Sequence, residues 1–185
     1  VRFEIAIDIT ERKRTEEALA RQLRFEQAVA AASACLLSVD TSETVVSDAL
    51  MFLLEASGVS RAYIFENFND PGDGLCMRQT FEACAPGVPP EINNPLLQHA
   101  VYSQGYERWR EVLSAGNAIR GHVCHFPDNE REVLESQGIL SILVLPLFVE
   151  GRWWGFIGFD ETCQPREWQD AEVALLETAA EMLGA

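Results

Sequence analysis

The segment Ser141–Asp160 reads SILVLPLFVEGRWWGFIGFD and carries the clearest β-strand signal in the chain. Two apolar runs, Ser141–Phe148 and Trp153–Asp160, flank the dipeptide Glu150-Gly151, and this arrangement predicts a hairpin with a tight turn. Both runs are apolar on both of their faces, which is typical of strands that are covered from two sides. The segment therefore predicts the central hairpin of a sheet that lies between two layers.

The rest of the chain predicts helices and strands around this hairpin. The expected elements, in chain order, are a helix at residues 40–57 ended by Gly58, strands at 61–69 and 75–84 joined by a turn, a loop with four prolines at 86–95, a helix at 106–114, a strand at 119–124, a helix at 128–137, the central hairpin, and a helix at 167–183. This order predicts an α+β fold, with an antiparallel sheet and terminal helices on one of its faces.

The first residues predict part of a different unit. Apolar and polar residues alternate over residues 1–9, which indicates a half-buried strand without a nearby partner, as at the end of a larger domain. Two apolar stripes then follow the helical pattern up to Leu37. One stripe has a heptad-like spacing, at Ala18, Phe25, Val29, Ala32 and Leu36, and favours a supercoiled partner helix. A single amphipathic helix packed on its own domain is the alternative.

Charge separates the N-terminal segment from the remainder of the chain. Residues 1–26 carry six basic and six acidic side chains, so the residues after them hold the whole net charge of −15. Phosphate groups need a basic face, so we expect neither nucleic acid nor an anionic membrane as a partner. A chain of 185 residues with 48% hydrophobic content can close one sizeable core.

The five cysteines, Cys35, Cys76, Cys84, Cys124 and Cys163, follow no disulfide or zinc spacing. We expect free thiols in a reducing cytoplasm and no metal site. The sequence contains neither a signal peptide nor an apolar run of the length that spans a membrane, so we expect a cytoplasmic segment.

Two stretches resemble known families. Residues 7–19, IDITERKRTEEAL, resemble the end of a PAS domain and its exit helix. Residues from about 25 onward resemble a GAF domain, on the motifs EVLESQGI at 132–139, SILVLPL at 141–147, WGFIGFD at 154–160 and REW at 166–168. The resemblance divides the chain into a PAS remnant at 1–10, a helical coiled-coil linker at 11–24 and a GAF domain at 25–185.

This resemblance implies a function. GAF domains of this kind are similar to those of PAS–GAF histidine kinases and diguanylate cyclases, where they act as non-catalytic sensors. It implies a parallel homodimer whose terminal helices carry a signal to a downstream output domain. It also implies a pocket on the sheet face away from those helices, roofed by residues 86–136, for a small molecule that the sequence does not identify. The alternative is a ligand-free structural relay.

Candidate pocket residues follow from the expected strands and roof. Arg120, His122 and Cys124 share one strand face by period two. They face the pocket if that face is the inner one, and lie at the surface if Ile119 and Val123 face inward instead. Adjacent tryptophans at 153 and 154 point to opposite faces, so one packs under the helices and the other faces the pocket. The pocket candidates are Phe65, Trp109, Arg120, His122, Cys124, Ser141 and Trp154; the dimer-interface candidates are Phe25, Val29, Leu36, Val173, Leu176, Ala180 and Leu183.

Four ligand-specific or enzymatic alternatives fit the sequence less well. The Cys124-His125 pair resembles the cysteine, often followed by histidine, to which bilin-binding members attach their chromophore. In those members, however, the cysteine lies fewer residues before the position that matches Ile139. Members that bind cyclic nucleotides carry an Asn-Lys pair that is missing before Phe159–Glu161. Free methionine sulfoxide reductases need a cysteine near Glu132, and a carboxylate cannot replace that thiolate. Haem has only three isolated histidines as candidate ligands, at positions 99, 122 and 125.

Overall fold

The computed structural model describes residues 43–184 together with residues 12, 13, 15, 16, 19, 20, 23, 27 and 30. The strand predicted at 1–9 lies outside the described residues, and so do the candidate interface residues Phe25, Val29 and Leu36.

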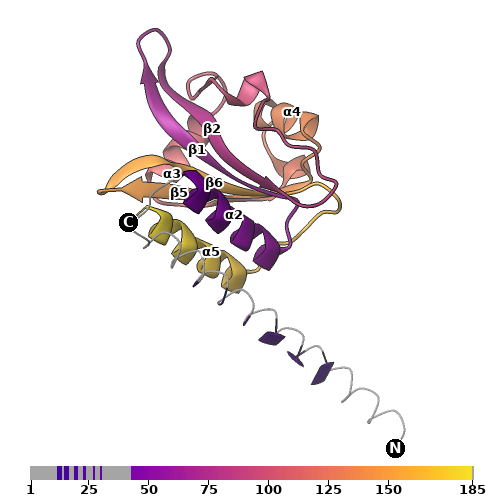
Figure 1. Cartoon of the computed structure of the whole chain (residues 1–185). Helices are drawn as coiled ribbons and strands as arrows, with labels where there is room; N and C mark the ends of the chain where they lie inside the picture. Colours follow the sequence, from indigo (N-terminus) through magenta and orange to yellow (C-terminus); the bar gives the residue numbers. More distant parts are fainter. Residues whose placement is uncertain are drawn as a thin grey trace, which may run out of the picture.

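Six antiparallel strands form one sheet in the spatial order β3-β2-β1-β6-β5-β4 (Figure 1). The strands are β1 (Arg61–Asp70), β2 (Gly74–Cys84), β3 (Ala100–Val101), β4 (Ile119–His122), β5 (Ser141–Val149) and β6 (Arg152–Glu161). The hairpin of β5 and β6 is central, as predicted. Its turn places Glu150 at a φ of 51° and Gly151 at 74°, the left-handed conformations that a two-residue hairpin turn of this hand requires.

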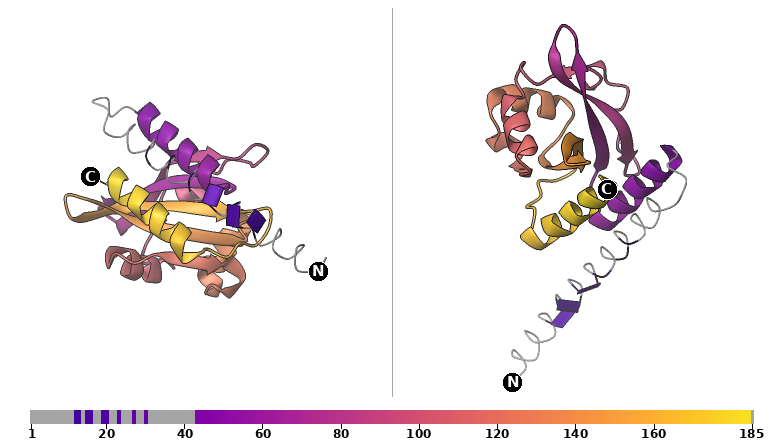
Figure 2. Two further views of the ribbon diagram at one scale, coloured as in Figure 1. Left: turned by 90° about the horizontal axis from the view of Figure 1, so that it is seen from below. Right: turned by 90° about the vertical axis from the view of Figure 1, so that its left-hand side faces the viewer.

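Helices cover both faces of this sheet. They are α2 (Glu43–Ser57), α3 (Glu107–Ser114), α4 (Asp128–Ser136) and α5 (Asp170–Leu183), with short 3₁₀ turns η1 (Pro95–Leu97) and η2 (Val123–His125). Figure 2 shows α2 and α5 side by side on one face, with α3 and α4 on the other. The predicted α+β fold with its terminal helices on one face is thus confirmed. In the part of the chain that the structure describes, no helix has the length and apolarity needed to cross a membrane.

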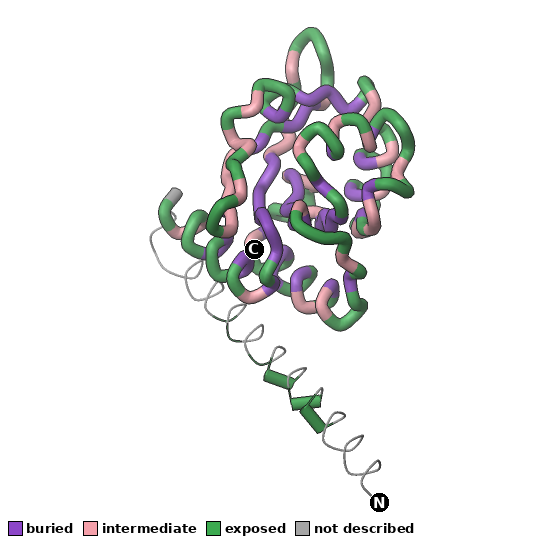
Figure 3. The backbone as a smooth tube through the Cα atoms, turned by 90° about the vertical axis from the view of Figure 1, so that its right-hand side faces the viewer, coloured by how far each residue is buried: buried purple, intermediate pink, exposed green. Residues whose placement is uncertain are grey.

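Two apolar clusters fill the layers on either side of the sheet. The first lies under α2 and α5 and includes Leu50, Leu53 and Leu176, all fully buried. The second lies under α3 and α4 and includes Trp109 and Phe156. In Figure 3 the buried stretches run through the middle of the molecule and the exposed ones lie around its periphery. Burial of apolar surface in both layers is the main force that holds the helices on the sheet.

Strand β3 was not predicted, and two predicted elements differ from the described structure by more than one residue at an end. The strand expected at 119–124 ends at His122, because the chain turns to place Val123 in the second apolar cluster, where its amide donates to Leu140 O. The last helix begins at Asp170 and not at residue 167. The backbone just before it is drawn onto the sheet, since the amide of Arg166 donates to Ser141 Oγ at 2.9 Å.

The apolar stripe of α5 is used within the chain. Val173, Leu176 and Ala180 are 6%, 0% and 2% exposed and lie in the cluster under the helices, with Leu183 packed against it. The sequence pattern assigned these four residues to an interface with a second chain. The structure corrects this assignment, because α5 turns this stripe toward β5 and buries it against the sheet.

Candidate functional site

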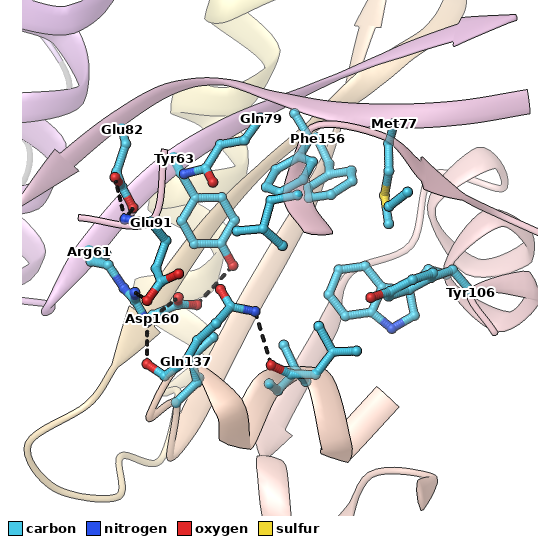
Figure 4. A pocket seen from close by; sticks show the side chains of 17 residues that line it. Arg61, Tyr63, Met77, Gln79, Glu82, Glu91, Tyr106, Gln137, Phe156 and Asp160 are labelled. Carbon is cyan, nitrogen blue, oxygen red and sulfur yellow. Dashed lines mark hydrogen bonds and ion pairs between the residues drawn. The ribbon is translucent and has the colours of Figure 1, made fainter. Parts of the chain in front are cut away.

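A cavity lies between the sheet and the layer of α3 and α4, on the face away from the terminal helices (Figure 4). Its volume is about 30 Å³, which is room for about two water molecules. Strands β1, β2 and β6 supply its floor, and the loop after β2, α3 and the end of α4 supply its walls. Its lining residues divide into an aromatic end and a charged end.

Stacked rings close the aromatic end. Phe65 and Phe156, on the neighbouring strands β1 and β6, stack with centroids 4.8 Å apart and planes 11° apart. Trp109 of α3 meets Phe156 edge-on at 5.7 Å, and Tyr63 meets Phe65 edge-on at 5.6 Å. These contacts are the favoured geometries of aromatic pairs, so this end is a rigid apolar wall.

A buried arginine occupies the charged end. Arg61 is 1% exposed, and its Nη2 donates to the carbonyl oxygen of Gln137 at 3.0 Å. Two carboxylates lie somewhat farther away, Asp160 at 3.4 Å and Glu91 at 3.6 Å. Glu91 is held in place by Glu82 of β2, whose carboxylate accepts from the Glu91 backbone amide. The charged end therefore brings one base and three acids to the same side of the cavity (Figure 4).

Burial changes the protonation of this cluster. Loss of solvation raises the pKa of Asp160 to about 7, although the Arg61 charge and a hydrogen bond from Tyr63 oppose the shift. Burial also raises the pKa of Tyr63 well above its usual value, and the charge of Asp160 adds to this effect. Asp160 thus takes up or releases a proton near neutral pH, inside the cavity.

Two buried polar atoms at the cavity have no hydrogen-bond partner in the described part of the chain. They are Nε of Arg61, a donor, and Oε1 of Gln79, an acceptor. Gln79 is 4% exposed and lies on β2. A buried polar atom without a partner carries a desolvation cost that a bound molecule or water can remove.

A carboxylate holds the roof of the cavity together. Glu130 of α4 is 1% exposed and accepts hydrogen bonds from Arg108 Nε at 2.8 Å and from Trp109 Nε1 at 2.9 Å. A second bond joins the same carboxylate to Arg108 Nη2. These bonds fasten α3 to α4 and fix the Trp109 ring above Phe156.

The structure brings only part of the predicted pocket set to this cavity. Phe65 and Trp109 line it. Of the two orientations possible for this strand, the structure has the one in which Ile119 and Val123 face inward. Arg120 and His122 therefore lie on the opposite side. There Arg120 pairs with Asp170 at 2.8 Å.

The other predicted pocket residues also lie outside the cavity. Ser141 Oγ is 3.2 Å from His122 Nδ1, and His122 Nε2 is 2.7 Å from Glu167 Oε1, beside the start of α5. Cys124 is exposed in η2 and does not line the cavity. Four cysteines in the described part, Cys76, Cys84, Cys124 and Cys163, are free.

Trp154 packs against the cluster under the helices, and Trp153 packs against the cluster on the cavity side. The two tryptophans do face opposite ways, but the assignment of Trp154 to the pocket is wrong. The reason is a β-bulge: Phe148 pairs with Trp153 and Leu147 with Gly155, so Trp154 is an extra residue. A bulge reverses the alternation of faces along a strand.

The charged end of the cavity was not predicted from the sequence. Arg61, Tyr63 and Phe65 alternate on β1, and Phe156 and Asp160 face them from β6. A charged residue at the first position of an apolar strand was the available signal for Arg61. Nothing in the sequence showed that Gln79 shares this face. Among the residues that the structure describes, no three His, Cys, Asp or Glu side chains are grouped to hold a metal ion.

Comparisons with known proteins agree with this architecture. The chain is 42% identical over 180 residues to the methanogenesis regulatory histidine kinase FilI of Methanothrix harundinacea (strain 6Ac). The match covers 97% of this chain but only 20% of that kinase, so the chain spans about a fifth of its relative.

Solved structures share the fold at low sequence identity. The phycocyanobilin-bound GAF domain of a cyanobacterial phytochrome superposes with a TM-score of 0.72, at 15% identity, over 86% of this chain and 91% of that one. The chromophore-binding domain of Stigmatella aurantiaca bacteriophytochrome superposes with a TM-score of 0.68, at 16% identity, over 86% of this chain and 58% of that one. A model of the GAF domain family matches residues 41–185. The chain belongs to the GAF domain family.

Proposed function

We propose that this chain is the regulatory sensor module of a multidomain cytoplasmic signal-transduction protein, and that it binds a small molecule in the cavity above the sheet. The observation that carries the proposal is the cavity itself, closed at one end by aromatic rings and lined by buried polar atoms that find no partner in the described part of the chain. The chain is non-catalytic in this proposal. The similarity to a histidine kinase of which it covers a fifth supports an output domain elsewhere in the parent protein.

Strand β6 offers a path from the cavity to the helices. Phe156 and Asp160 line the cavity, whereas Ile157 and Phe159 of the same strand pack under α2 and α5. A ligand that moves β6 therefore also changes the surface on which α5 rests. A ligand shifts the helix arrangement only by the difference between its affinities for the two arrangements.

The segment before α5 is joined to the sheet at several points. The Arg166 side chain donates to Ser57 O at 2.9 Å and to Glu161 Oε1 at 3.1 Å, and it pairs with Glu172 of α5. Its guanidinium also lies 4.8 Å from the Trp168 ring centroid. This residue connects the end of α2, the end of β6 and the start of α5, so movement of β6 reaches both helices.

A homodimer is part of this proposal. Leu19 and Leu23 are four residues apart on the linker helix and are 63% and 53% exposed. Two large apolar side chains on one exposed helical stripe favour a partner helix. We place the dimer contact on this stripe. We also propose the division into a PAS remnant at 1–10, a linker at 11–24 and a GAF domain from 25 onward. In this division the linker helix with Leu19 and Leu23 connects two signalling domains.

A ligand-free relay is the second candidate function. The specific observation in its favour is that the cavity is small, with the rings of Phe65, Phe156 and Trp109 packed together at one end of it. A tetrapyrrole such as the one named for the similar phytochrome domain does not fit this volume, and Cys124 lies outside the cavity. In this case α5 and the linker would carry only the signal of the preceding domain.

Native mass spectrometry of the protein purified from its host separates the two candidates. The sensor function predicts a bound small molecule that the variant Ala100→Val loses, because Ala100 lines the cavity and the larger side chain fills it. The relay function predicts no bound molecule and an unchanged signal output of the parent protein in the same variant. Exposed Ala115→Val, at the end of α3, is the control for the substitution itself.

A further inference from the structure

The Arg61 guanidinium has few hydrogen bonds for a buried arginine. It carries five N–H groups, and within the described part of the chain one of them makes a hydrogen bond, to Gln137 O at 3.0 Å. The contacts to Asp160 and Glu91, at 3.4 and 3.6 Å, are ion pairs beyond good hydrogen-bond distance, and Nε has no partner among the residues that the structure describes. Arg61 can therefore still accommodate an acceptor of a bound molecule, and a carboxylate suits its fork of donors best.

Gln79 presents the opposite requirement. Its Oε1 is buried and has no partner in residues 43–184 or the other described positions, and Figure 4 shows the amide turned toward the cavity between Tyr63 and Phe156. This oxygen can only accept, so the matching group of a ligand is an N–H or O–H donor. A ligand that satisfies both atoms must carry an acceptor at one position and a donor at another.

The surrounding charges restrict the ligand further. Glu82 and Glu91 lie on the same side of the cavity as Arg61, so an anion without a balancing positive charge is repelled. A cation alone leaves Arg61 unsatisfied and faces its positive charge. A molecule with both charges matches this end without adding net charge to a buried site.

The size and shape of the cavity favour a ligand with a small aliphatic part. The cavity has room for only a few heavy atoms, and its far wall consists of Phe65, Met77, Trp109 and Phe156. Met77 is the most adaptable part of this wall, because its unbranched side chain can change rotamer to enlarge the space.

We propose that the cavity binds a small zwitterion of the amino-acid class, with its carboxylate on Arg61 and its ammonium group on Gln79 Oε1. This proposal rests on the proposed function of the cavity as a ligand site. The small apolar part of the ligand lies against Phe65 and Met77. The raised pKa of Asp160 supports the arrangement, since a partly protonated Asp160 leaves more of the Arg61 charge available to the ligand.

Isothermal titration of the whole chain at pH 7 tests the proposal with a matched series of probes. The zwitterions are glycine and L-alanine, which both carry N–H donors and are the smallest members of the class. Propionate is L-alanine without its ammonium group, and ethylamine is L-alanine without its carboxylate. We expect at least one zwitterion to bind, and both L-alanine fragments to bind at least tenfold more weakly than it does.

Two variants locate the contacts. Gln79→Leu keeps a side chain of similar size, and we expect it to weaken zwitterion binding at least tenfold while leaving propionate unchanged. Arg61→Met should abolish binding of the zwitterion and of propionate; if it does not fold, Gln79→Leu alone decides. Arg78→Met is the control, because Arg78 pairs with Glu66 on the same hairpin and does not line the cavity.

The outcomes separate this proposal from the proposed function. Equal affinity for propionate and the zwitterions, or unchanged affinity in Gln79→Leu, overturns the zwitterion. A molecule of another class found in the cavity by native mass spectrometry, with no zwitterion binding, overturns it but leaves the sensor function standing. If no molecule of any class binds, both proposals fail.

Discussion

Tyr63 and Asp160 meet across strands β1 and β6, where Tyr63 Oη donates a 2.8 Å hydrogen bond to Asp160 Oδ1. Both side chains are buried, and the Arg61 guanidinium lies 3.4 Å from the other carboxylate oxygen. The carboxyl group thus receives one hydrogen bond and one loose ion pair in a site from which water is largely excluded. Desolvation outweighs these two contacts, so the pKa of Asp160 rises to about 7.

The first prediction concerns pH. The pKa of Asp160 is near 4 in the unfolded chain and about 7 in the folded one, so between these values the folded state binds more protons. The contribution of Asp160 to stability is therefore greatest at low pH and is lost as pH rises toward 7. Asp160→Asn removes this titration and retains an acceptor for Tyr63.

Urea unfolding of wild type and Asp160→Asn at pH 5.5 and pH 8 measures the effect. From pH 5.5 to pH 8, the unfolding free energy of Asp160→Asn should increase by about 2 kcal/mol relative to that of wild type. Asp48→Asn, on the exposed side of α2, is the control and should follow wild type at both values. A constant difference between Asp160→Asn and wild type would show that Asp160 does not titrate in this range.

The second prediction concerns Gly158, which lies beneath the Tyr63 ring. A Cβ atom at Gly158 would be 2.2 Å from Tyr63 Cε2, so Gly158→Ala must displace the ring and break its hydrogen bond to Asp160. We expect a loss of about 1–3 kcal/mol in thermal or urea unfolding. Gly72→Ala, where a Cβ atom would be 3.4 Å from Asp70 Oδ1, should change stability by no more than ~0.5 kcal/mol. Equal stability of both variants would argue against this position of the ring.

The third prediction concerns the roof. Glu130→Ala leaves Trp109 Nε1 buried without its acceptor and frees Arg108, so we expect a loss of about 1–3 kcal/mol. The emission of Trp109 should also change, because its ring is no longer held. Glu132→Ala removes an exposed carboxylate from the same helix and should leave stability and fluorescence unchanged. A stable Glu130→Ala variant with wild-type emission would contradict the role of this clamp.

The fourth prediction concerns the helices. The double variant Leu19→Glu, Leu23→Glu should remain folded and give the mass of a monomer by light scattering, because both side chains are exposed. Leu176→Glu should unfold the chain, because it places a charge in the fully buried layer under α5. If the double variant has the mass of a dimer, the dimer contact does not involve Leu19 and Leu23. If Leu176→Glu is a folded monomer, α5 is part of the dimer interface.

The sequence by itself determined the long strands, the helices after residue 40 and their order, but not the two-residue strand β3. The runs at 141–148 and 153–160, with Glu150-Gly151 between them, predicted the central hairpin, because a two-residue turn and apolar alternation are local properties. It also determined the location of the cavity through the resemblance to GAF domains, and with it two of the lining residues, Phe65 and Trp109.

Only the tertiary structure decided which other side chains face the cavity. Bulges at Trp154 on β6 and at Thr80 on β2 reverse the alternation of faces, so Trp154 and Phe81 turn to the helices. The partners of Arg61 come from residues 76 and 99 positions away, at Gln137 and Asp160. The two-residue period of a strand shows which residues share a face. Strand pairing decides where each bulge lies and which face packs against α3 and α4.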